Sequence, residues 1–400
     1  MTHVEALTCG VCGREFSPGE VTYTCPAHDG VGGSLDVRYE YDALAGAFDV
    51  PGTVEDLWAF APLLPVDGEP VVSLGAGGTP LLDAPALSAD LGVSVRVKDE
   101  TGNPTGSSKD RGSAVAVTRA RQRGRSVVSC ASTGNAAASL AGYAARAGLD
   151  CRIFVPADLP EAKAVQPRVY GADVLAVEGD YEDASRVCHA TATERGWYDC
   201  SAGVNPYMFE GKRTLGFELA RDAADADWVA MAMGNGCSLA ATWKGMAESD
   251  RLGLSDGTAR FLGVQAEGAS AIHDRFTDEW GDGAGETAAD SIDVAAPHSA
   301  KRACCALADS GGDAVLVDDD AILRAQRRLG EHEGLFVEPA SAATVAGVER
   351  ALAAGVIDPA DEVVVVATGT GLKDTRTAGR AAEGGRRVDV DSDPDTVPEF

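Results

Sequence analysis

The chain has 400 residues, of which 45% are hydrophobic and 6% aromatic, and its formal net charge is −28. This length predicts two or more domains in a globular α/β protein. The excess of acidic over basic residues (62 against 34) excludes an extended surface for nucleic acid or anionic membrane, because phosphates would be repelled. No run is apolar enough to span a membrane, and the start lacks a signal-peptide pattern, so we expect a cytoplasmic protein.

The chain contains seven lysines, and arginine supplies nearly all of the other positive charge. An acidic, lysine-poor composition predicts a halophilic cytoplasm, where salt screens the repulsion between carboxylates. With so few lysines present, we expect those that remain to have specific roles. The ten cysteines do not form the pattern of a secreted disulfide framework.

Residues 1–35 predict a small zinc-ribbon-like module. Cys9 and Cys12 form one Cys-x2-Cys pair, and Cys25 and His28 form a Cys-x2-His pair. Two such turns can place four ligands around one tetrahedral zinc ion, which would stabilise a stretch with few apolar residues. With four protein ligands the site would be structural. The alternative is a set of free thiols with a chance histidine, and His28 is the weakest of the four ligands.

From residue 93 onward, strand and helix patterns alternate, which predicts a mainly parallel sheet covered by helices on both faces. The predicted strands are 93–97, 126–131, 151–155, 173–178, 197–201, 228–233, 260–266, 314–317 and 362–367. The predicted helices are 109–123, 135–147, 159–170, 181–194, 210–222, 238–247, 318–333 and 340–353. The Gly- and Asp-rich stretch 274–297 predicts a mobile insertion, and residues 381–400 predict a disordered acidic tail.

Four strand-to-helix junctions have unusual sequences, and ligands of such sheets bind at the carboxyl ends of the strands. A loop rich in Gly and Pro brings Lys109 to a helix start. Alone, this lysine could equally be a solvated side chain. Three further loops follow predicted strands: Ser132-Thr133-Gly134-Asn135, Gly234-Asn235-Gly236-Cys237-Ser238, and a loop that begins at Thr368.

The chemistry of these loops is complementary. The loop at 132–135 offers hydroxyls and backbone N–H groups to a carboxylate, although an ordinary helix cap would look similar. The loop at 234–238 predicts a phosphate site, and it is not a Walker loop because no Gly-Lys-Ser/Thr follows. An amine, a carboxylate site, a phosphate site and a hydroxyl together predict a pyridoxal 5'-phosphate site with Lys109 as the Schiff-base lysine.

The combination closely resembles the threonine synthase family, pyridoxal-phosphate enzymes with the tryptophan-synthase β-subunit fold, here with a haloarchaeal-like composition. The matching stretches are 103–112 (Asn-Pro-Thr-Gly-Ser-Ser-Lys-Asp-Arg-Gly), 132–135, 205–211, 263–268 (Gly-Val-Gln-Ala-Glu-Gly), 338–343 (Glu-Pro-Ala-Ser-Ala-Ala) and 368–374. The resemblance implies two open, mainly parallel sheets. It further implies a large cofactor-binding domain (36–124 and 202–380), a small inserted domain (125–201), and a homodimer as a common assembly.

The resemblance also implies individual roles. Lys109 would bind the cofactor covalently and, once released, act as general base at the substrate Cα. Asn135 would contact the phenolic oxygen of the cofactor, and Thr368 the pyridine nitrogen. Ser132, Thr133 and Gly134 would hold the carboxylate of a small amino-acid substrate. The cofactor phosphate would lie on Gly234, Asn235, Gly236, Cys237 and Ser238.

The chain departs from the family pattern at positions that recognise the phosphate of phosphohomoserine. Ala202, Gly203 and Met208 stand where the family has Asn, Ser and Arg, and losing a guanidinium at a phosphate site is not conservative. Lys212 and Arg213, about 5 Å further along the helix, are candidates to substitute.

The leading hypothesis is conversion of O-phosphohomoserine and water to threonine and phosphate. One alternative is a paralogue that performs β-elimination or β-replacement on another amino acid, like a serine/threonine dehydratase. A non-enzymatic alternative is a sensor that binds pyridoxal phosphate or an amino acid.

Overall fold

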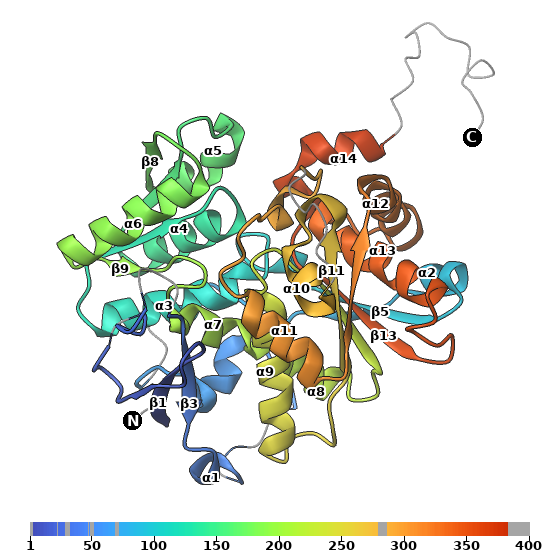
Figure 1. The fold of residues 1–400 in the computed structure, drawn as a ribbon, viewed down its shortest axis with the longest axis horizontal. Helices are drawn as coiled ribbons and strands as arrows, with labels where there is room; N and C mark the ends of the chain where they lie inside the picture. The colour runs from blue at the N-terminus through green and yellow to red at the C-terminus, as the bar shows by residue number, and fades with distance from the viewer. Residues whose placement is uncertain are drawn as a thin grey trace, which may run out of the picture.

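Three sheets organise the protein, whose computed structural model describes residues 3–21, 23–28, 33–46, 48, 52–68, 72–278 and 286–382 (Figure 1). The strands are β1 (Val4–Cys9), β2 (Glu15–Phe16), β3 (Leu35–Tyr39), β4 (Leu81–Asp83), β5 (Ser94–Asp99), β6 (Val127–Ala131), β7 (Asp150–Pro156), β8 (Asp173–Val177), β9 (Tyr198–Asp199), β10 (Trp228–Ala232), β11 (Arg260–Ala266), β12 (Asp313–Val317) and β13 (Glu362–Ala367). Their orders in the sheets are β2-β1-β3, β12-β11-β10-β13-β5-β4 and β8-β7-β6-β9.

Helices cover the two larger sheets. They are α1 (Tyr41–Leu44), α2 (Pro85–Leu91), α3 (Lys109–Gln122), α4 (Asn135–Ala147), α5 (Glu161–Val169), α6 (Tyr181–Arg195), α7 (Pro206–Lys212), α8 (Thr214–Asp222), α9 (Cys237–Arg251), α10 (Ala271–Thr277), α11 (Ala300–Asp309), α12 (Asp319–Glu333), α13 (Pro339–Ala353) and α14 (Thr375–Ala381). In the described residues no helix combines the length and apolarity needed to cross a membrane.

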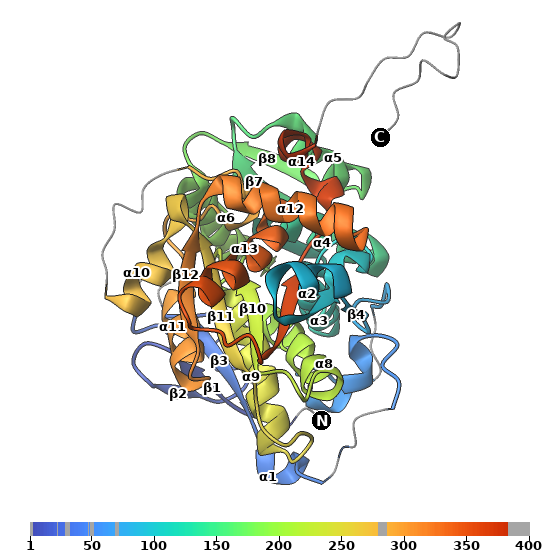
Figure 2. The ribbon, with the colours of Figure 1, turned by 90° about the vertical axis from the view of Figure 1, so that its right-hand side faces the viewer.

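The six-stranded sheet is parallel except for its edge strand β4. Its central strand β13 contains four consecutive valines, Val363 to Val366, each at most 1% exposed. Such an apolar run suits a strand that is buried on both faces. Helix α13 packs on β10, β11, β12 and β13, and α12 packs on α13 as an outer layer (Figure 2).

The four-stranded sheet is parallel throughout, with α4 and α6 packed on its central strands β6 and β7. Helix α3 connects the two parallel sheets, because it follows β5, precedes β6 and packs against both α4 and α7. The α/β class and the two mainly parallel sheets predicted above are therefore present.

The N-terminal sheet is antiparallel and extends beyond residue 35, because β3 continues to Tyr39. It is tied to the rest of the protein: the Tyr39 hydroxyl donates to Glu210 on α7 at 2.7 Å, and Lys244 on α9 donates to the Val37 carbonyl at 2.6 Å. The domain limits given above remain predictions.

Two sequence predictions differ from the structure. The predicted helix 210–222 is two helices, α7 and α8, which meet at Arg213. Helix α7 starts earlier because Pro206 occupies its first turn and the Asn205 side chain accepts from the Tyr207 N–H at 2.9 Å, a typical helix start. In the predicted mobile insertion, the described residues include α10 and the buried Ala289 and Ile292.

Several short elements were not predicted, among them α2, α10 and α11, which are 7 to 10 residues long. Residues 279–285 of the predicted insertion and 383–400 of the predicted tail lie outside the described residues, whereas residue 381 ends α14.

Candidate active site

One cavity of about 640 Å³ lies where the strands of both parallel sheets end. It is lined by every residue assigned above to the cofactor or the substrate: Lys109, Ser132, Thr133, Gly134, Asn135, Gly234, Asn235, Gly236, Cys237, Ser238 and Thr368. The four loops predicted to be complementary follow β5, β6, β10 and β13, so the parallel arrangement brings them to one place. The volume is that of a site for a small ligand.

Lys109 is the first residue of α3, and the C-terminal loop fixes its position. The Ser108 N–H donates to the Thr368 carbonyl at 2.8 Å, and the Thr370 N–H donates to the Gly106 carbonyl at 3.1 Å. Gly106 has φ +89°, and a Cβ there would lie 2.9 Å from Thr370 Cγ2, so only glycine fits. The loops after β5 and β13 therefore act as one unit that places the lysine.

The Lys109 amine is half-buried and, among the described residues, donates no hydrogen bond and forms no ion pair. Burial, and next the positive charge of Lys212, lower the pKa of Lys109, while the Glu338 carboxylate opposes the shift. A lysine with a lowered pKa is more often neutral, which a nucleophile or general base requires.

The loop at 234–238 needs its glycines because other segments approach it closely. Gly236 has φ +78°, and a Cβ there would meet the Cβ of Ala303 at 2.8 Å. Cys237 begins α9, so the first backbone N–H groups of a 15-residue helix face the cavity. This is the geometry that favours an anionic group.

Glu338 is the first residue of the motif at 338–343, and no role was predicted for it. Its carboxylate is 2% exposed and accepts hydrogen bonds from the Asn135 amide at 2.8 Å and the Ser291 hydroxyl at 2.9 Å. The hydroxyl of Thr368 is 3.4 Å away. Glu338 therefore connects the two residues predicted to contact opposite positions of the cofactor ring. The sequence feature that could have indicated a role for Glu338 is its position directly before Pro339, which begins a helix.

Residues 290–296 also line the cavity, although the sequence predicted a mobile insertion for this stretch. The residues that follow this segment anchor it: the His298 N–H donates to the Asn235 side chain and the Ser299 N–H to the Asn235 carbonyl, both at 3.2 Å. The segment thus forms one wall of the cavity beside the loop at 234–238.

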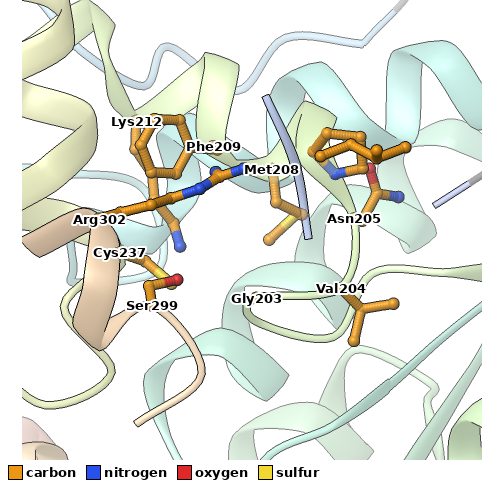
Figure 3. Close-up of a pocket in the computed structure, with 11 residues that line it drawn as sticks. Gly203, Val204, Asn205, Met208, Phe209, Lys212, Cys237, Ser299 and Arg302 are labelled. Atoms are coloured by element: carbon orange, nitrogen blue, oxygen red, sulfur yellow. The ribbon is translucent and has the colours of Figure 1, made fainter. Parts of the chain in front are cut away.

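The three positions that depart from the family pattern are divided between two cavities. Ala202 lines the large cavity, whereas Gly203 and Met208 line an adjacent space of only about 10 Å³. Lys212 and Cys237 line both (Figure 3). The positively charged side chains near these positions are therefore Lys212 and Arg302, and Met208 contributes an apolar side chain.

The four predicted metal ligands come together in the N-terminal sheet. The ligand atoms of Cys9, Cys12, Cys25 and His28 all lie within 4.8 Å of one another. The Val11 N–H donates to the Cys9 sulfur at 3.4 Å. His28 Nε2 is buried, and no described residue hydrogen-bonds to it.

Comparison with known proteins identifies the same family of enzymes that the sequence motifs resemble. The model of the pyridoxal-phosphate dependent enzyme family matches residues 72–369. The threonine synthase of Methanocaldococcus jannaschii is 38% identical over 395 residues, covering 96% of each chain. That of Methanosarcina acetivorans is 38% identical over 399 residues, covering 97% of this chain and 96% of its own.

Solved structures share the fold. Threonine deaminase isoform 2 from Solanum lycopersicum superposes with a TM-score of 0.64 at 22% identity, covering 76% of this chain and 83% of that one. A maize serine racemase superposes with a TM-score of 0.63 at 20% identity, covering 73% of this chain and 88% of its own. These structures show the architecture alone. The sequence identity over nearly the full length decides the family: the chain belongs to the threonine synthase family of pyridoxal-phosphate-dependent enzymes.

Proposed function

We propose that this protein is a lyase that converts O-phosphohomoserine and water to threonine and phosphate with pyridoxal phosphate as cofactor. The observation that carries the proposal is one cavity in which four features converge: a lysine without a hydrogen-bond or ion-pair partner among the described residues, a loop that offers hydroxyls and N–H groups, a helix N-terminus and a threonine hydroxyl. The similarity to threonine synthases along nearly the whole chain supports the same reaction.

In this proposal the residues act at different atoms of the ligands. Backbone N–H groups and hydroxyls at Ser132, Thr133 and Gly134 bind the substrate carboxylate, and the N-terminal turn of α9 binds the cofactor phosphate. Lys109 holds the cofactor covalently and, when released, removes the proton from the substrate Cα.

Other residues of the site would set the orientation and the protonation state of the cofactor ring. Bound pyridoxal phosphate supplies an electron sink for the bonds at the substrate carbons. Asn135 and Thr368 would contact its phenolic oxygen and its ring nitrogen, and the Glu338 carboxylate accepts a hydrogen bond from the Asn135 amide. A hydroxyl at Thr368, in place of a carboxylate, leaves the ring nitrogen largely unprotonated.

A second candidate reaction is elimination from an unphosphorylated amino acid such as serine or threonine. Met208, 3% exposed and apolar, stands at a family phosphate-recognition position and favours this alternative. One experiment separates the candidates: purified holoenzyme in high salt is supplied with phosphohomoserine, serine or threonine. Release of phosphate together with threonine supports the proposal. Formation of a 2-oxo acid from serine or threonine, without phosphate release from phosphohomoserine, supports the alternative. A spectral shift without any product supports a sensor.

We also propose that Cys9, Cys12, Cys25 and His28 bind a structural zinc ion. Three thiolates and an imidazole are a common zinc ligand set, and the unpartnered His28 Nε2 suits a metal ligand. We expect about one zinc per chain by metal analysis, and a lower melting temperature after chelation. A protein that contains no zinc when purified from zinc-containing medium, and that does not respond to chelator, would contradict this assignment.

A further inference from the structure

Lys212 lies where the large cavity meets the small one. It is the last residue of α7, only 6% exposed, and it lines both spaces together with Cys237. Figure 3 shows Lys212 and Arg302 extending into the region that also holds Cys237, Ser299 and Met208.

No acceptor in the described part of the chain bonds to the Lys212 ammonium. Two other lysines with little exposed side-chain surface are paired. Lys244 donates to Asp36 at 3.0 Å and to Glu210 at 2.9 Å, and Lys98 contacts Glu218 at 2.8 Å. A buried ammonium without a partner is costly unless an anion joins it. The lining position of Lys212 indicates that this anion comes from the cavity.

A second cation lines the small space. Arg302, on α11, has a buried Nη2 atom to which no described residue hydrogen-bonds, and its guanidinium lies 4.8 Å from the Phe209 ring. The side-chain atoms Cys237 Sγ and Ser299 Oγ, 2.9 Å apart, stand next to both cations. Two cations, a hydroxyl and the start of α9 converge here, which is a set of groups suited to a phosphate-type dianion.

The position of Lys212 relates it to the missing arginine at 208. A Cβ on Gly112 of α3 would lie 3.3 Å from both Lys212 Cε and Met208 Cε. The two side chains therefore run along the same strip of α3, one turn of α7 apart. This chain carries the positive charge of this strip at position 212, whereas the family pattern described above has it at position 208.

We propose that Lys212, assisted by Arg302, binds the phosphate group at the distal end of the amino-acid substrate, and so determines which substrate the enzyme accepts. This inference rests on the proposed function for the identity of the substrate. The same chemistry would also fit the cofactor phosphate, so the experiment must distinguish the two sources.

The test compares holoenzyme of the wild type with Lys212→Gln and Lys212→Arg, using Lys301→Gln as a matched control. Lys301 is the neighbour of Arg302 but is exposed and bonds to the Gly10 carbonyl at 2.7 Å. Calorimetry measures binding of inorganic phosphate, equilibrium dialysis measures cofactor affinity, and steady-state kinetics give KM and kcat for phosphohomoserine. Circular dichroism confirms that each variant is folded.

We expect Lys212→Gln to weaken phosphate binding and raise KM by about tenfold or more, with cofactor affinity changed by less than about threefold. Lys212→Arg should restore most of the phosphate binding and bring KM close to the wild-type value. Lys301→Gln should behave as wild type. Equal phosphate binding by wild type and Lys212→Gln, or none by wild type, would overturn the inference. A tenfold loss of cofactor affinity with unchanged phosphate binding would assign Lys212 to the cofactor instead.

Phosphate binding is measured without turnover, so it also separates this inference from the proposed function. A wild type that binds phosphate through Lys212 but releases none from phosphohomoserine would contradict the reaction while leaving the anion site in place. An Arg302→Gln variant provides a second route to the same site, with a smaller loss of phosphate binding expected.

Discussion

The first turn of α3 carries two basic residues with opposite surroundings. Arg111 is fully buried, and its guanidinium donates to Glu100 at 2.7 Å, to Glu218 at 2.6 Å and to the Thr214 hydroxyl at 3.0 Å. Lys109, two residues earlier, faces the cavity and has no such partner among the described residues. Residues two apart on a helix point to opposite sides, so one helix supplies both groups.

The difference between these regions is one of pairing, because both are shielded from water. Burial alone would raise the pKa of Glu218, but the Arg111 guanidinium outweighs it and holds that pKa well below its usual range. In the cavity, burial and the Lys212 charge act together on Lys109 and lower its pKa. Charges that are satisfied within the chain stabilise the fold, and charges left unsatisfied beside a cavity indicate where ligands bind.

The largest effect is expected from removing the unpaired lysine. Lys109→Ala should reduce turnover by about 10³-fold or more, because it removes both the covalent attachment and the proposed base. Its unfolding free energy should stay close to that of wild type, since no described residue pairs with Lys109. Phosphate release and chemical denaturation in the same buffer measure the two quantities. If the Lys109→Ala variant kept wild-type turnover, Lys109 would not have the catalytic role assigned to it.

Breaking the paired cluster of Arg111, Glu100 and Glu218 should mainly lower the free energy of unfolding. Arg111→Met leaves Glu100 and Glu218 buried without their main partner, which we expect to cost about 3–5 kcal/mol of unfolding free energy. The matched control is Asp225→Asn, which removes an exposed pair with Arg96 and should cost less than about 1 kcal/mol because solvent screens it. Equal losses in the two variants would show that pairing inside the cluster does not stabilise the fold.

The cluster also predicts how stability depends on pH. The folded-state pKa of Glu218 is depressed, so its contribution is fully present above the unfolded pKa of a glutamate. It should be lost progressively as the pH falls from there toward the lower folded-state value. Unfolding free energies of wild type and Arg111→Met should therefore converge in acid, and a constant difference down to low pH would contradict this account.

A smaller effect concerns the pH dependence of activity. Only the neutral Lys109 amine can accept a proton, so kcat should rise as the pH increases through its pKa. Because the Lys212 charge lowers that pKa, Lys212→Gln should move the acid limb of the kcat profile to higher pH. Glu338→Gln should move it to lower pH, since the Glu338 carboxylate acts in the opposite direction. Two shifts of the same sign would show that these charges do not act on Lys109.

Sequence reasoning was most successful where chemistry and local pattern coincide. The bounds of α4, β11 and β13 were predicted to the residue. Helix α4 ends before Gly148, and the apolar run of β13 ends before the polar Thr368. The loops after β5, β6, β10 and β13 were recognised as a set, and the structure places them around one cavity. Parallel strands made this possible, since their carboxyl ends share an edge.

Sequence reasoning was least successful where long-range packing decides. Beside the break at Arg213, helices α8 and α9 approach closely: a Cβ on Gly216 would lie 2.1 Å from the Thr242 carbonyl oxygen, a contact that no local pattern encodes. Whether a lysine is paired depends on residues far away in sequence: Lys244 finds Asp36, whereas Lys212 finds no partner among the described residues. For the same reason, the link from Glu338 to Asn135 across 203 positions could not be predicted.

The most direct test of the central claim, that the unpaired Lys109 amine is the attachment point of the cofactor, is chemical. Holoenzyme is reduced with borohydride, digested, and mapped by mass spectrometry for the lysine that carries the pyridoxyl group. The predicted result is a single modified peptide that contains Lys109. Modification of Lys212, Lys373 or another lysine in place of Lys109, or a holoenzyme with no modified lysine, would contradict the account.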